Sequence, residues 1–362
     1  MVRKHYLLVK LCSREGLRLL WCREMKRSIG IGLLVLVICL LAGIPVLPAG
    51  TGGDYVTGRV AVLPREGAGV AALPASAVSE DSYAMMQWSL HKAMVPQAWQ
   101  ITSGDASTII AVLDTGVDKR HEDLTGKVVS EVNFTTSPTA ADVYGHGTHV
   151  AGIIAAVANN GIGIAGLAYD CRLLNVKVAD DGGWVTSSAL AKGIIWAVDH
   201  GAKVINMSLY LLEPSIEVEQ AVEYAWSKGA LLVASSGNYL GNRAVYPAYY
   251  DKCLGVAATD ARDELTLWSG RGDWVEVAAP GVSIYSTLPG NNYQALSGTS
   301  MAAAHVSGLA GLLFTVARDR NGNVFTNDEV RAAIESSCDR VPSGYVKGRI
   351  NALKAVQQVA GE

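Results

Sequence analysis

The feature that most constrains this chain is a series of short apolar runs, rich in β-branched residues, that alternate with longer helical stretches. Each run reads as a strand buried on both faces. The runs are STIIAVLD (107–114), RLLNVKV (172–178), AKVINMSL (202–209), GALLVASS (229–236) and CLGVAAT (253–259). Three stretches between them have helical patterns, namely 146–159, 185–201 and 214–229. The last two end in Gly201 and Gly229, which suit helix C-termini. The alternation predicts an α/β fold of three layers, with a mostly parallel sheet and helices on both faces.

The first fifty residues differ from the rest. Residues 1–28 carry eight of the 30 Lys and Arg but only two of the 33 Asp and Glu, and an apolar run, IGIGLLVLVICLLAGIPVL, follows. This pattern is typical of a secretory signal, whose true start could be Met25. The run also approaches the length of a membrane span, so an uncleaved anchor is the alternative. We therefore expect a signal peptide or anchor in 1–50, a short pro-segment or linker in 51–80 and one domain in 81–362.

The composition of that domain excludes some partners. Outside residues 1–28 the balance is 22 basic against 31 acidic residues, a net charge of −9. No basic stripe is present, so we expect no nucleic-acid partner. Three cysteines remain there, namely Cys171, Cys253 and Cys338, and they lack metal-type spacing. We expect them to be small buried side chains, with one disulfide plus a free thiol as the alternative.

Four polar residues stand where predicted elements begin or end. Asp114 closes the first strand, His146 lies between two glycines before a helix, and Ser300 follows Gly298 at the start of an apolar helix. A serine becomes a nucleophile when imidazole takes its proton and a carboxylate orients that imidazole. Asn238, after another strand, can donate to an oxyanion.

Each of these residues also has a simpler interpretation. Ser300 could be a helix N-cap, and Asn238 could suit a left-handed turn. On spacing alone, His149 competes with His146 for the functional role. The nucleophile elbow G-x-S-x-G does not fit, because GTSMA lacks its last glycine and the order here is Asp, His, Ser.

Motifs in matching order resemble those of the subtilisin-like serine peptidases. They are AVLDTGVD, GHGTHVAGI, NNGIGIAG, INMSL, SSGN, YPAYY, WVEVAAPG, SGTSMA and KGRINALKAV, within residues 81–358. The resemblance implies a subtilisin-like fold with Asp114, His146 and Ser300 as the triad. It also implies Asn238 as the oxyanion donor, supported by Thr299, and it selects His146 over His149.

The resemblance further implies a calcium site. The loop after the His146 helix alone favours a plain Asn-Gly turn, but matching a related peptidase's strong Ca²⁺ site gives a full set of oxygen ligands. The matched ligands are Asp81, Asp123, Asn160 and the carbonyls of Val157, Ile162 and Ile164. A second site of that relative would lie between Asn133 and Tyr144, where this chain has few acids, so we expect it to be absent.

Substrate is expected to bind as an added β-strand between two edges of the protein. By the same resemblance, the contacts come from Ser208, Leu209 and Tyr210, from Gly182, Gly183 and Trp184, and from Ser235, Ser236 and Gly237. Tyr210 and Trp184 are bulkier than family members have there. We expect them to narrow the subsite for the fourth residue before the scissile bond, unless Tyr210 turns to solvent.

The resulting expectation is a secreted, calcium-dependent serine endopeptidase that acts through an acyl-enzyme. It would have broad specificity, with apolar or aromatic residues favoured before the cut. Its partners would be protein or peptide substrates, with a membrane only if the N-terminal segment stays uncleaved, and we expect a monomer. The alternative from another class is an anchored, non-catalytic binding protein that keeps the fold.

Overall fold

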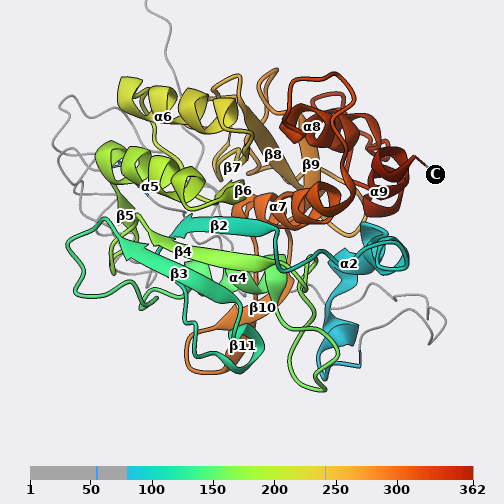
Figure 1. The fold of residues 1–362 in the computed structure, drawn as a ribbon, viewed down its shortest axis with the longest axis horizontal. Helices are drawn as coiled ribbons and strands as arrows, with labels where there is room; N and C mark the ends of the chain where they lie inside the picture. Colours follow the sequence, from blue (N-terminus) through green and yellow to red (C-terminus); the bar gives the residue numbers. More distant parts are fainter. Residues whose placement is uncertain (1–53, 56–79, 241, 362) are drawn as a thin grey trace, which may run out of the picture. The chain divides into compact units, whose positions relative to one another are not determined.

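A seven-stranded parallel sheet forms the middle layer of the protein (Figure 1). The computed structural model describes residues 54–55, 80–240 and 242–361, all within the unit formed by 53–362. The predicted signal or anchor, and nearly all of the pro-segment, lie outside the described residues. In spatial order the strands are β3 (Val128–Asn133), β4 (Arg172–Lys177), β2 (Ile109–Asp114), β6 (Ala202–Met207), β7 (Leu231–Ser235), β8 (Cys253–Thr259) and β9 (Val277–Pro280).

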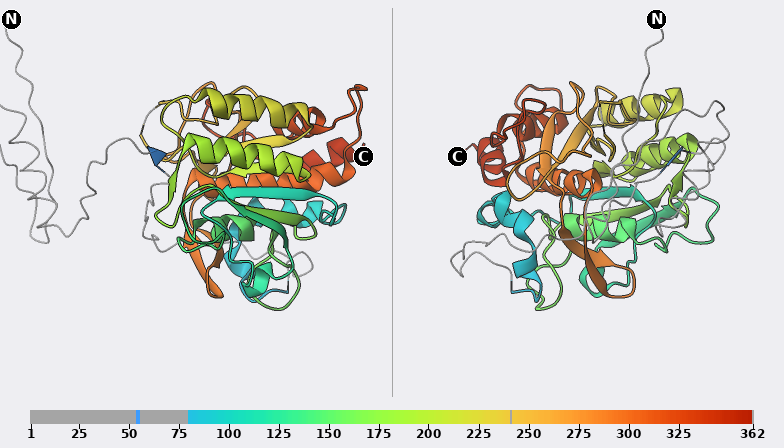
Figure 2. Two further views of the ribbon diagram at one scale, coloured as in Figure 1. Left: turned by 60° about the vertical axis from the view of Figure 1, so that its left-hand side comes forward. Right: turned by 180° about the vertical axis from the view of Figure 1, so that it is seen from behind.

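Helices cover both faces of the sheet because successive side chains of a buried strand point to opposite sides. In β2, Ile110 and Val112 face one core, which also holds α4 and α7, whereas Ala111 and Leu113 face the other, which holds α5 and α6. Figures 1 and 2 show α5 and α6 side by side on one face. The bounds are α4 (His146–Ala155), α5 (Ser187–Asp199), α6 (Ile216–Ser227) and α7 (Thr299–Val316). This confirms the predicted three-layer α/β fold.

The strand order places the ends that carry polar residues together. The chain leaves β2 toward β4 and β3 on one side and later continues through β6 and β7 on the other side. Parallel sheets bind ligands beyond the carboxyl ends of strands where the winding direction changes. Asp114 ends β2, Ser208 follows β6 and Asn238 follows β7. The candidate residues therefore share one edge of the sheet.

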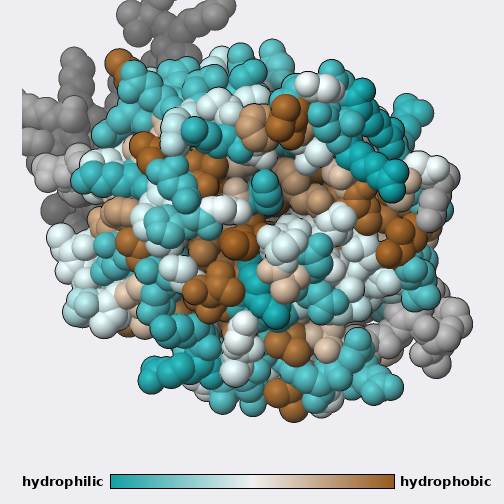
Figure 3. Space-filling view, viewed as in Figure 1, coloured by the Kyte–Doolittle hydropathy of each residue, from teal (hydrophilic) through white to brown (hydrophobic). Residues whose placement is uncertain are grey.

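Smaller elements surround this layered centre. β10 (Ile284–Leu288) and β11 (Asn292–Leu296) form an antiparallel hairpin, and β1 (Asp54–Tyr55) pairs antiparallel with β5 (Trp184–Val185). The other helices within the described residues are η2 (Ala84–Met86), α2 (Trp88–Lys92), α3 (Val95–Ala98), η3 (Glu122–Leu124), α8 (Asn327–Ser336) and α9 (Ala352–Ala360). On the face in Figure 3, apolar side chains are interspersed among polar ones.

The central helix α7 is mostly apolar. Among the described residues it is the one helix long and apolar enough to cross a membrane, yet most of it is buried inside the protein. Cys171 and Cys253 are also fully buried, and burial raises the pKa of the Cys171 thiol to about 12. Both thiols are free, as is that of the half-buried Cys338, which confirms the interpretation of the first two as small core side chains.

Candidate active site

Asp114 and His146 meet at the carboxyl edge of the sheet. Nδ1 of His146 lies 2.7 Å from Oδ1 of Asp114, and the Asp114 side chain is completely buried. Because a carboxylate only accepts hydrogen bonds, Nδ1 carries the proton and Nε2 of the neutral ring is an acceptor. The backbone N–H of Thr115 donates to the same Asp114 oxygen at 2.7 Å, which holds the carboxylate in place.

The glycine after His146 permits this contact. A Cβ at Gly147 would lie 2.1 Å from the carbonyl oxygen of Gly116 and 3.0 Å from Cβ of Asp114. Any side chain there would push the start of α4 away from the end of β2. The missing side chain at this glycine thus lets the backbone that follows β2 lie close to the start of α4.

Ser300 stands in the first turn of α7 without capping it. The N-cap is Gly298, and no side chain caps the helix. Oγ of Ser300 donates to the carbonyl oxygen of Ser208 at 3.0 Å, and Oγ of Ser208 donates back to the carbonyl oxygen of Ser300 at 2.8 Å. The N-cap interpretation of Ser300 is wrong. These reciprocal bonds fix the serine to the end of β6, while α7 also packs against α4.

Asn238 is tied to the same helix start. Its Oδ1 accepts hydrogen bonds from the backbone N–H and from Oγ1 of Thr299, at 2.8 and 3.0 Å. Asn238 is not among the non-glycine residues of positive φ, and Gly237 supplies the left-handed conformation instead, with φ of +89°. The left-handed-turn interpretation of Asn238 is therefore wrong, and Thr299 contacts the amide that it is expected to support.

The competing histidine belongs to the core. His149 is fully buried, and its Nε2 contacts the carbonyl oxygen of Gln294 at 3.0 Å. Burial lowers its pKa to about 3, so the ring is neutral at physiological pH. The resemblance had selected His146, and this placement of His149 agrees with that selection.

The two expected substrate edges are β5 and the segment that follows β6. Asp54 and Tyr55 of β1 run antiparallel to Val185 and Trp184 of β5. The β5 edge thus already accepts an extended segment of this chain. Trp184 is 44% exposed, whereas Tyr210, on the other expected edge, is only 7% exposed and meets the Tyr239 ring edge-on at 6.0 Å. The alternative that Tyr210 turns to solvent is wrong.

The third expected substrate segment is tightly packed. Ser235 and Ser236 are buried, and Oγ of Ser236 donates to the carbonyl oxygen of Gly270 at 3.0 Å. A Cβ at Gly237 would lie 2.7 Å from the ring of Tyr239. Gly182 and Gly183 precede β5, and Leu209 is fully buried.

Two carboxylates gather at the expected calcium loop. Asp81 accepts hydrogen bonds from the backbone N–H groups of Asn159, Asn160 and Gly161 at 2.9, 2.9 and 3.2 Å. Asp123 accepts from Nδ2 of Asn160 at 3.0 Å and from the N–H of Ile164 at 2.8 Å. Burial raises the pKa of Asp123, because its ionised form loses water.

The donor set fits a hard cation. The two carboxylates, the Asn160 amide and the carbonyls of Val157, Ile162 and Ile164 are all oxygen donors, which Ca²⁺ prefers. At position 163 the loop leaves no room for a side chain, because a Cβ at Gly163 would lie 1.8 Å from Oδ2 of Asp123. A second calcium site is expected to be absent between Asn133 and Tyr144, where Asp142 is the one acidic residue. The absence of that second site stays a prediction.

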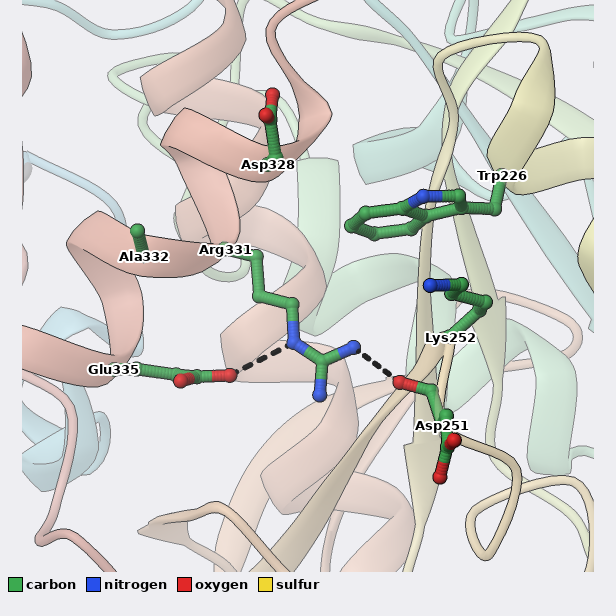
Figure 4. Close-up of a pocket in the computed structure, with 7 residues that line it drawn as sticks. All are labelled: Trp226, Asp251, Lys252, Asp328, Arg331, Ala332 and Glu335. Atoms are coloured by element: carbon green, nitrogen blue, oxygen red, sulfur yellow. Dashed lines mark hydrogen bonds and ion pairs between the residues drawn. The ribbon is translucent and has the colours of Figure 1, made fainter.

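Two of the cavities among the described residues differ in their position relative to the catalytic edge of the sheet. One of about 480 Å³ adjoins Gly145, next to His146, and is lined by Val143, Tyr144, Gly145, Leu288, Pro289, Asn292, Tyr293 and Gln294. The other, of about 260 Å³, lies before the amino end of β8 and is lined by Trp226, Asp251, Lys252, Asp328, Arg331, Ala332 and Glu335 (Figure 4). There Arg331 already donates to Glu335, Glu276 and the carbonyl of Asp251.

Sequence reasoning missed a buried polar network behind His146. Asp142 accepts from Oγ1 of Thr115 at 2.9 Å and the N–H of Gly145 at 2.8 Å, and from the N–H and Oγ1 of Thr148 at 2.9 and 2.7 Å. Lys177, at the end of β4, is fully buried nearby. The one available signal was a lysine at the end of a strand that is otherwise mostly buried and apolar.

Comparison with known proteins agrees with this site. Residues 105–353 match the model of the Subtilase family. Thermitase from Thermoactinomyces vulgaris is 45% identical over 76% of this chain and 97% of its own length, and Subtilisin Savinase from Lederbergia lenta is 37% identical over 75% and 98%. A solved protease from Pseudoalteromonas arctica PAMC 21717 is 28% identical, with a TM-score of 0.71 over 78% of this chain and 99% of that one.

Proposed function

The chain belongs to the Subtilase family and is a subtilisin-like serine endopeptidase, and from this premise we propose that Ser300, His146, Asp114 and Asn238 are its catalytic residues. The observation that carries this assignment is the 2.7 Å contact between Nδ1 of His146 and Oδ1 of Asp114. This contact favours the tautomer in which Nε2 of His146 can act as the base. In the proposal, that base takes the proton of the Ser300 hydroxyl.

In the proposed mechanism Ser300 attacks the carbonyl carbon of the scissile peptide bond. Nε2 of His146 takes the hydroxyl proton, and the Asp114 carboxylate stabilises the resulting imidazolium. His146 then gives the proton to the leaving amine, and an acyl-enzyme forms on Oγ of Ser300. Water, deprotonated by the same imidazole, releases the acyl group and restores the serine.

The oxyanion of each tetrahedral intermediate would form beside Asn238. Because Thr299 donates twice to Oδ1 of Asn238, the Nδ2 group is left as the donor side of the amide. The backbone N–H of Ser300, in the first turn of α7, would be a second donor to the same oxyanion. Such preset donors act on charge that appears only in the transition state.

Substrate would bind as an antiparallel strand on β5. The pairing of Asp54 and Tyr55 with Val185 and Trp184 supports this mode, because it has the main-chain register that a bound peptide would use. Family resemblance further suggests broad specificity, with apolar or aromatic residues favoured before the cut. The buried Tyr210 and the half-exposed Trp184 would restrict the subsite for the fourth residue.

Calcium would bind at the loop around Asp81 and Asp123. A bound ion supplies positive charge that offsets the repulsion between these carboxylates and holds the loop closed. We also propose secretion and a monomeric state, with the N-terminal apolar segment as the export signal or, if uncleaved, as a membrane anchor. The basic start and apolar run of the sequence support export.

An active-site-directed fluorophosphonate tests the catalytic assignment. Wild-type protein should be labelled, Ser300→Ala should not be, and His146→Ala should be labelled far more slowly because the hydroxyl loses its base. Thr315→Ala is the matched control, since Thr315 lies near the other end of the same helix and bonds to Thr102 instead. Labelling that persists in folded Ser300→Ala would refute the assignment.

A further inference from the structure

Lys177 is a completely buried lysine at the catalytic edge of the sheet. It is the last residue of β4, lies opposite Asp114 in the β2–β4 register, and has no exposed side-chain surface. A buried ammonium group is costly unless hydrogen bonds and an opposite charge replace the lost water. The groups that replace it here show what the lysine holds together.

The Lys177 ammonium has three partners from three separate segments. It donates to the carbonyl oxygen of Thr115, donates to that of Ala141 at 3.3 Å, and forms an ion pair with Oδ1 of Asp181 at 2.8 Å. The lysine also holds the pKa of the Asp181 carboxyl below its usual value. Asp181 is the only one of the three partners that carries a charge.

Each of these segments leads directly to a group that the reaction needs. Thr115 follows Asp114 and donates to its carboxylate. Ala141 precedes Asp142, which accepts from the N–H groups at the start of the His146 helix. Asp181 opens the short loop that runs into Gly182 and β5, the edge on which the substrate strand would lie.

We propose that Lys177 is a positioning residue that fixes the β5 substrate edge relative to the Asp114–His146 pair. This inference rests on the proposed function, because it assumes that catalysis and substrate pairing occur at those two places. Lys177 touches no reacting atom. Its ammonium group binds the end of β2, the loop before α4 and the loop before β5 at once, and we call this set of three contacts the Lys177 clamp.

The expected effect of removing the clamp is loss of alignment. A displacement of about 1 Å in a positioning group can cost roughly a hundredfold in rate. Lys177→Met keeps an unbranched apolar stem but removes the charged terminal nitrogen and all three of its contacts. Asp181→Asn removes only the ionic link to the substrate loop and leaves the two carbonyl contacts, so its effect should be larger on substrates that extend over β5.

The test compares two substrates in the full chain. One is a blocked single-residue p-nitroanilide, and the other a blocked tetrapeptide p-nitroanilide whose chain reaches β5. We expect Lys177→Met to lower kcat by about tenfold or more on both and to raise KM on the tetrapeptide. Asp181→Asn should raise KM on the tetrapeptide several-fold, with a smaller change on the short substrate, and Lys177→Arg should recover most of the activity. Lys203→Met, on the exposed side of β6, is the matched control.

The outcomes separate this inference from the proposed function. If Ser300→Ala stays active, the catalytic assignment fails. If Ser300→Ala is inactive while folded Lys177→Met has wild-type constants on both substrates, only the positioning role is wrong. Should Lys177→Met not fold, Asp181→Asn decides: an unchanged tetrapeptide KM, or an equal loss on both substrates, overturns the inference.

Discussion

Thr299 and Asn238 are joined by two hydrogen bonds to one oxygen. The N–H and Oγ1 of Thr299 both donate to Oδ1 of Asn238, at 2.8 and 3.0 Å. The first bond comes from the backbone and remains whatever side chain stands at this position. The second comes from the hydroxyl and can be removed alone, which makes the orientation of the amide experimentally accessible.

Thr299→Val should therefore lower kcat by about tenfold while KM changes little, because the amide keeps one tether and becomes less well aligned in the transition state. Thr299→Ser keeps the hydroxyl and should stay near wild type. Thr315→Val, near the other end of α7, is the control. Steady-state kinetics on a peptide p-nitroanilide measures kcat and KM separately. A change confined to KM would contradict the prediction.

Asn238→Ala removes the proposed donor itself. We expect kcat to fall by roughly a hundredfold or more, a magnitude taken from measurements in this same family, with little change in KM. The fluorophosphonate should still label Ser300, more slowly, because the nucleophile and its base remain. Wild-type kcat in this variant would place the oxyanion elsewhere.

Tyr210→Gly and Trp184→Gly should widen the subsite for the fourth residue before the cut. Tyr210 is buried against Tyr239, so its removal opens space beneath the substrate strand, whereas Trp184 is half-exposed and borders that strand from β5. A peptide library varied at that position should show gained turnover of large aromatic residues in both variants. If the wild type already accepts them fully, the restriction does not exist.

Chelation should lower the melting temperature, and added Ca²⁺ should restore it, because an ion that binds only the folded state stabilises it by mass action. Asp123→Asn should abolish most of this dependence, since it removes one of two carboxylates at the loop. Asp199→Asn changes a surface carboxylate that pairs with Tyr224 and should keep the full calcium response. Equal responses in both variants would contradict the site.

Buried histidines should make the protein sensitive to acid. Burial lowers the pKa of His305 to about 4 and that of His149 to about 3. Between an unfolded pKa of roughly 6.5 and these values, the unfolded chain binds protons that the folded protein does not. The free energy of unfolding should therefore fall as pH drops below about 6.5.

His305→Leu removes one of the groups that takes up a proton on unfolding. The slope of the free energy of unfolding against pH should therefore decrease by up to about 1.4 kcal/mol per pH unit, the value for one proton. Denaturant unfolding at several pH values between neutrality and acid measures the slope. His200→Leu, at an exposed position after α5, is the control and should keep the wild-type slope. Equal slopes in both variants would show that His305 does not contribute.

The strand ends and their polar residues were predictable because they depend on local pattern. Apolar runs gave β2, β4, β6, β7 and β8, and Gly201 and Gly229 follow α5 and α6 with positive φ, as expected. The family motifs selected His146. Spacing alone could not separate the two histidines, because the burial of His149 in the core is visible only in the folded structure. Periodicity assigns residues to elements, whereas the role of a buried polar group depends on its tertiary partners.

The Lys177 clamp and the burial of Tyr210 were not predictable for that reason. Lys177 ends a mostly apolar strand, but its partners Thr115, Ala141 and Asp181 come from three parts of the chain. Tyr210 is buried by Tyr239, which follows a different strand. The short strands β1 and β5 carry no alternation long enough to read, and their pairing arises only in the folded chain.

The serine proposed as nucleophile is built into the first turn of the helix that runs through the middle of the molecule. No hinge or peripheral loop carries it, so partial fraying of the surface cannot displace it. Heat inactivation and cooperative melting of the whole domain should then coincide in time and temperature. The activity that remains after heating should then be proportional to the fraction of molecules that are still folded.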